Sequence, residues 1–67
     1  MRMSVAERDY FEMLKEDWNT YEISFSPDRE HPFEAYPHTD PSTVLTAPSA
    51  QQLRALIRID HVNRTRT

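Results

Sequence analysis

The central segment of the chain concentrates histidines and carboxylates, the side chains that most often bind metal ions. These residues are Asp28, His31, Glu34, His38 and Asp40. Zinc sites favour short spacings of roughly three to five residues between histidine ligands, whereas six residues separate His31 from His38. Histidines in loops on a polar surface explain this pattern better, so we expect no metal site.

The composition also argues against catalysis. A nucleophile needs a positioned base and an oxyanion hole, and no motif here joins a serine to a histidine. The chain contains no glycine, which excludes a phosphate-binding loop of the usual form. A chain of 67 residues has little volume for a closed pocket of about 300 Å³ or more. We expect neither an enzyme nor a bound cofactor.

The best candidate for a functional surface is a row of basic side chains near the C-terminal end. Arg54, Arg58 and His61 recur at helical spacing, and Arg64 continues the row. Nucleic-acid-binding surfaces usually combine a positive net charge with interleaved aromatic residues. This chain has a net charge of −3, and no Phe, Tyr or Trp residue is interleaved with the row. We therefore predict that these four residues bind a partner, most simply an acidic protein surface.

The spacing predicts a helix over residues 49–62 that carries this row. Gln52 stands three residues after Ser49, which is the pattern of a capping box. An apolar stripe at helical spacing would face the core. It consists of Ala50, Leu53, Leu56 and Ile57.

Asp60 falls inside the apolar stripe of this helix. A buried aspartate is unfavourable unless it is paired. One interpretation places Asp60 at the solvent-exposed end of the stripe, where it pairs with Arg64 four residues later in the helix. The other makes Asp60 an anchor that accepts hydrogen bonds from another chain or from the first helix.

A second helix is expected over residues 4–18. Ser4 and Glu7 form another capping box, and apolar residues occupy less than half of the helical circumference, opposite a charged side. Asn19 is expected to end this helix, because asparagine tolerates the left-handed conformation best after glycine.

The middle of the chain is typical of three short strands. Apolar and polar residues alternate over residues 21–25, as in a strand with one buried face. All five prolines lie between positions 27 and 48 and mark strand ends, because proline cannot donate a ladder hydrogen bond. Two more strands are expected near residues 33–36 and 43–46.

This order of elements predicts an α+β fold with α-β-β-β-α connectivity, a three-stranded antiparallel meander with two helices packed on one face. We expect a single domain over residues 1–62 and a disordered basic tail over residues 63–67.

Size and charge point to a partner chain. A core this small rarely supplies more than about 3–5 kcal/mol, and the chain has no cysteine to form a disulfide. The net charge is −3, of which residues 1–48 contribute −6 and residues 49–67 contribute +3. We expect a homodimer, in which the basic row can meet the acidic first helix of the other subunit around Glu12 and Glu16.

With no signal peptide or membrane span, we expect a cytoplasmic protein that is complete from Met1.

The segment TVLTAPSAQQLRALIRID resembles small uncharacterised proteins of actinobacteria and their phages, over roughly residues 18–62. That resemblance implies the fold and the origin, but no function. The element order is also that of double-stranded-RNA-binding domains, which place lysines at the start of the last helix. The matching residues here, Ala50, Gln51 and Gln52, are uncharged, and a negative net charge disfavours nucleic acid.

These observations favour a small non-enzymatic module for protein interaction or regulation, acting through surface complementarity as a homodimer. The alternative is a nucleic-acid-associated accessory protein that uses the basic C-terminal helix.

Overall fold

Helix α1 (Val5–Asp17) begins at its predicted serine cap. The backbone N–H of Glu7 donates to Ser4 Oγ at 3.1 Å. The computed structural model describes residues 3–66, and none of these residues has a positive φ. The expectation that Asn19 ends α1 in a left-handed conformation is therefore wrong. Trp18 is the C-cap instead, and its N–H donates to the carbonyl of Leu14 at 3.0 Å.

Three antiparallel strands form the sheet, with β2 (Phe33–Pro37) between β1 (Tyr21–Phe25) and β3 (Leu45–Ala47). The alternation read from the sequence is confirmed, because Tyr21 and Ile23 are buried while Glu22 and Ser24 are exposed. The sheet therefore has a core face and an open face.

Strand β3 begins later than the sequence pattern suggests. The pattern predicts a strand near residues 43–46, whereas the ladder pairs Leu45 with Ala35 and Ala47 with Phe33. Thr43 is held in the preceding turn, where its hydroxyl donates to Asp40 at 2.7 Å. This side-chain hydrogen bond competes with strand pairing.

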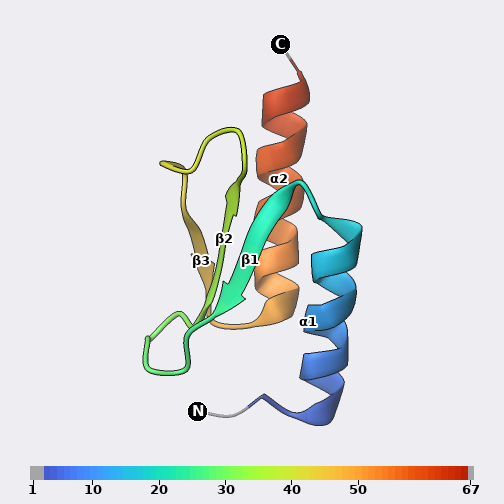
Figure 1. Cartoon of the computed structure of the whole chain (residues 1–67), viewed down its shortest axis with the longest axis vertical. Coiled ribbons are helices and arrows are strands. Elements are labelled where there is room, and N and C mark those ends of the chain that lie inside the picture. Colours follow the sequence, from blue (N-terminus) through green and yellow to red (C-terminus); the bar gives the residue numbers. More distant parts are fainter. Residues whose placement is uncertain (1–2, 67) are drawn as a thin grey trace.

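Both helices pack against the sheet, which confirms the predicted α-β-β-β-α layout. Helix α2 (Ala50–Thr65) contacts β2, β3 and α1, and α1 also contacts β1 (Figure 1). Phe33 lies in the core. The centroid of its ring lies 5.7 Å from that of the Phe11 ring and 4.9 Å from that of the Phe25 ring. Phe33, Leu53 and Ile57 are completely buried.

Helix α2 continues past the end that the sequence suggested. Residues 63–65 are helical, so the predicted disordered tail is wrong for these residues. Thr67 lies outside the described residues. The last turns of α2 extend beyond the sheet (Figure 1). There, the hydroxyl of Thr65 donates to the carbonyl of His61 at 3.0 Å. The guanidinium group of Arg64 pairs with the carboxylates of Asp40 and Asp60.

Across the described part of the chain, neither helix is long and apolar enough to cross a membrane.

Candidate interaction surface on helix α2

The start of α2 is fixed by a hydrogen-bonded cap. The N–H of Gln52 donates to Ser49 Oγ at 3.2 Å, as the capping box predicts. The side chain of Gln52 accepts from the Ser49 hydroxyl at 3.4 Å, whereas a full capping box would pair it with the N–H of Ser49. This cap fixes where α2 begins.

The core side of α2 carries fewer residues than the predicted apolar stripe. Ala50, Leu53 and Ile57 are buried, whereas Leu56 is 36% exposed. Leu56 lines a surface hollow together with Thr46 and Ala47 of β3, so it lies at the rim of the interface between α2 and the sheet.

The opposite side of α2 presents apolar side chains to solvent. Ile59 is 59% exposed and Val62 is 44% exposed. Ala55 is also exposed, and it lies one turn before Ile59, so the three side chains share one side of the helix. We call Ala55, Ile59 and Val62 the outer face of α2. The spacing of its members is visible in the sequence, but their exposure becomes apparent only from the packing of α2.

Arg54 and Arg58 border the outer face. Together with it they line a shallow groove, which Gln51 and Asn63 complete. Both guanidinium groups belong to exposed residues. Within residues 3–66, neither arginine forms an ion pair or a side-chain hydrogen bond. Their positive charges are therefore not compensated within the described chain.

His61 does not lie in this groove. Its ring and the Trp18 ring form an edge-to-face pair, with a centroid distance of 5.2 Å and an interplanar angle of 69°. His61 therefore packs on the C-terminal end of α1 and links the ends of the two helices. Sequence spacing alone had placed it with the two arginines.

Arg64 is occupied by two carboxylates. Its Nε donates to Asp60 Oδ2 at 2.7 Å, and a terminal nitrogen donates to Asp40 Oδ2 at 3.1 Å. The predicted pairing of Asp60 with Arg64 is confirmed. These bonds raise the pKa of Arg64. The structure thus separates the four predicted partner-binding residues into two exposed arginines and two residues that make contacts within the protein.

Asp60 also accepts a hydrogen bond from Tyr21 on β1, at 2.5 Å. The anchor interpretation of Asp60 had suggested the first helix or another chain as the donor. Burial, followed by the hydrogen bond and charge of Asp60, raises the pKa of Tyr21 to about 12. For Asp60, partial burial pushes the pKa up, but the hydrogen bonds from Tyr21 and Arg64 outweigh burial and lower it.

Asp40 completes this network from the turn between β2 and β3. It accepts hydrogen bonds from the hydroxyls of Thr43 and Ser42, each at 2.7 Å, as well as from Arg64. Hydrogen bonds from Thr43, Ser42 and Arg64, in that order, lower the pKa of Asp40 to about 2. Asp40 is one of the five residues of the central segment whose types suggest metal binding. The signal for its actual role is an aspartate followed closely by Ser42 and Thr43, a pattern typical of turns.

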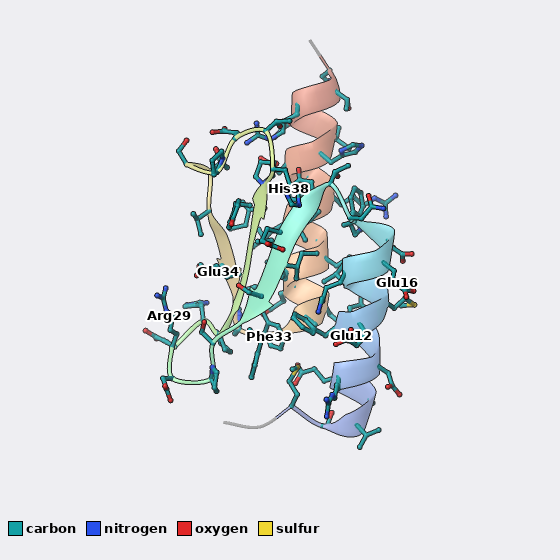
Figure 2. The ribbon with its side chains drawn as sticks, in the orientation of Figure 1. Glu12, Glu16, Arg29, Phe33, Glu34 and His38 are labelled. Carbon is teal, nitrogen blue, oxygen red and sulfur yellow. The ribbon has the colours of Figure 1, made fainter. Side chains whose placement is uncertain are left out.

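The candidate metal ligands are distributed over different parts of the fold. His31 precedes β2. His38 lies towards the other end of that strand, far from its first residue Phe33 (Figure 2). Glu34 pairs instead with Arg29 at 3.3 Å. Among the described residues, no group of three or more histidine, aspartate or glutamate side chains is placed to hold a metal ion.

A second groove lies near the polar network. It is lined by Asn19, Thr20, Tyr21, Pro37, His38, Thr39, His61 and Arg64. The guanidinium group of Arg64 in this groove is neutralised by Asp40 and Asp60. The groove therefore attracts an anion less strongly than its composition suggests. The outer face of α2 and its two arginines are the stronger candidate surface.

Comparison with models of known protein families found none that matches this chain. Comparisons with curated proteins and with solved structures found no match either.

Proposed function

We propose that this protein is a small non-enzymatic interaction module that binds another protein through the outer face of α2. The observation that carries this proposal is the exposure of Ile59 and Val62 on the side of α2 away from its core residues. Adjacent exposed apolar side chains with a polar border are typical of protein-binding surfaces.

The two bordering arginines indicate what kind of partner fits. Arginine is enriched at protein interfaces, and charge complementarity selects partners and speeds their association. Arg54 and Arg58 carry uncompensated charge beside the outer face, so the partner combines apolar side chains with nearby acidic groups.

A nucleic acid is a weaker fit to this surface. Phosphate binding gains affinity with each cation engaged, and within residues 3–66 only Arg54 and Arg58 of the four predicted basic residues have no side-chain partner. Arg64 is bound to Asp40 and Asp60, and His61 lies against Trp18. A steep loss of binding with rising salt would identify phosphates as the target.

The experiment compares the same substitution at two exposed aliphatic residues. Ile59→Asp places a carboxylate in the outer face. Val44→Asp places one outside both helices, at a residue whose exposed fraction is similar: 51% for Val44 and 59% for Ile59. Each tagged variant is used to capture proteins from the native host, with identification by mass spectrometry.

The proposal predicts that proteins captured by the wild type are lost with Ile59→Asp and retained with Val44→Asp. Equal capture by both variants would contradict it and would place the working surface elsewhere. The open face of the sheet around Glu22, Ser24 and Tyr36 would then be the next candidate. Circular dichroism on the same samples checks that both variants are folded.

A further inference from the structure

The two helices carry opposite charge. Helix α1 contains five acidic and two basic residues, a net charge of −3. Helix α2 contains three arginines and one aspartate, a net charge of +2. Arg64 and Asp60 neutralise each other, so the positive charge of α2 that remains available belongs to Arg54 and Arg58.

These opposite charges do not neutralise each other within one molecule. The two helices pack side by side, yet over residues 3–66 no ion pair joins α1 to α2. The only ion pair of α1 in this range is local, between Lys15 and Glu12 at 3.7 Å, and both side chains are well exposed. The chain thus displays an acidic and a basic surface at the same time.

The acidic surface of α1 also carries apolar side chains. Val5 is 80% exposed and Met13 is 48% exposed. Asp9, Glu12 and Glu16 are exposed as well, and Figure 2 shows Glu16 on the side of α1 that points away from α2. Residues 5, 9, 12 and 16 recur at helical spacing, so they form one row. We call this row, with Met13, the acidic row of α1.

We infer that the partner of the outer face of α2 is the acidic row of α1 from a second copy of this chain. The inference rests on the proposed function, since it names the occupant of the same surface. The acidic row supplies both kinds of group that the outer face requires: apolar side chains and carboxylates for Arg54 and Arg58. A twofold dimer makes this contact twice, because each copy presents both surfaces.

A pair of charge-reversed variants tests this arrangement. One variant carries Arg54→Glu and Arg58→Glu, so both of its surfaces are negative. The other carries Glu12→Lys and Glu16→Lys, so both of its surfaces are positive. Sedimentation at micromolar concentration is expected to give twice 8.0 kDa for the wild type and a dissociation constant raised at least about tenfold for each variant alone, because like charges then meet.

An equimolar mixture of the two variants should recover the dimer, because both contacts become complementary again. This recovery is specific to contact between α1 and α2. If α2 instead packed on α2 of the other copy, the Glu12→Lys, Glu16→Lys variant would dimerise normally by itself, which would overturn the inference. Failure of the mixture to associate while each variant is folded would also overturn it.

Asp28→Lys with Glu30→Lys provides the matched control. It changes the net charge as much as the lysine variant of α1 does, but in the exposed β1–β2 turn, so dimerisation should persist. Loss of the dimer in this control would show an effect of net charge and would contradict the assigned contact. Any charge-reversed variant that fails to fold is replaced by its glutamine counterpart, for which a weakened dimer is expected.

A wild-type chain that remains at 8.0 kDa at all micromolar concentrations overturns the second copy as occupant. That result leaves the proposed function standing if Ile59→Asp still abolishes capture of a host protein. Equal capture by Ile59→Asp and Val44→Asp would instead contradict the proposed function itself.

Discussion

The hydroxyl of Tyr21 donates to Asp60 Oδ2, which ties the first strand to the last helix across 39 positions of sequence. This bond and the contacts of Arg64 hold the C-terminal half of α2 against the body of the protein. The outer face extends into that half of the helix, so its position depends on this network.

Tyr21→Phe is expected to lower the free energy of unfolding by about 1–2 kcal/mol. It removes one donor from the partly buried carboxylate of Asp60, and an unsatisfied hydrogen-bond partner is destabilising. Urea denaturation measures the effect. Tyr36→Phe is the matched control, because Tyr36 forms no side-chain hydrogen bond within residues 3–66. Equal midpoints for the two variants would show that the bond to Asp60 contributes nothing.

The stability of the protein is expected to fall on acidification, in part through Asp40. Hydrogen bonds from Thr43, Ser42 and Arg64 lower its pKa in the folded state to about 2, from a usual value of 3.8. The unfolded chain therefore takes up a proton first as the pH falls. The contribution of Asp40 is complete well above pH 3.8 and is lost as the pH falls through about 2.

Denaturation midpoints measured as a function of pH test this assignment. Asp40→Asn should flatten the acid side of the stability profile, because the asparagine side chain does not titrate. Asp28→Asn, in the β1–β2 turn, serves as the control. The assignment to Asp40 is refuted if its variant keeps the acid slope of the wild type.

Ser49→Ala is expected to destabilise the protein by about 0.5–2 kcal/mol, because it removes the acceptor for the N–H of Gln52. Chemical denaturation with an unchanged midpoint would mean that this hydrogen bond does not stabilise the start of α2.

The sequence predicts the local elements of this fold because their signals are local. Serine caps mark both helices, and alternation in residues 21–25 marks β1. Helical spacing also predicts the Asp60–Arg64 pair. These features depend on residues within about one turn or one strand of each other, so a sequence pattern contains the information.

The contacts between distant residues could not be predicted in this way. Tyr21 reaches Asp60, and Asp40 reaches Arg64, only after the strands and α2 have packed. The same packing places His61 on Trp18 and removes it from the arginine row. The helical state of residues 63–65 has a similar origin, because Arg64 gains its second carboxylate from the turn after β2.

Arg54→Ser combined with Arg58→Ser is expected to change the free energy of unfolding by no more than about 1 kcal/mol, because substitutions at exposed positions usually have small effects. Arg64→Ser should destabilise more, because it leaves Asp40 and Asp60 without their shared cation. Thermal unfolding of both variants checks this order. A double variant less stable than Arg64→Ser would show that Arg54 and Arg58 support the fold rather than binding.

Amide chemical shifts followed through a dilution series of the isotopically labelled chain test most directly that α2 provides the contact surface. Within α2, the predicted concentration-dependent shifts lie along the outer face at Ala55, Ile59 and Val62, with Arg54 and Arg58 beside them. On the sheet, the amides around Glu22, Ser24 and Tyr36 should stay constant. Shifts confined to the open face of the sheet would contradict the account. The absence of shifts at every concentration would contradict the second copy as the partner of the outer face.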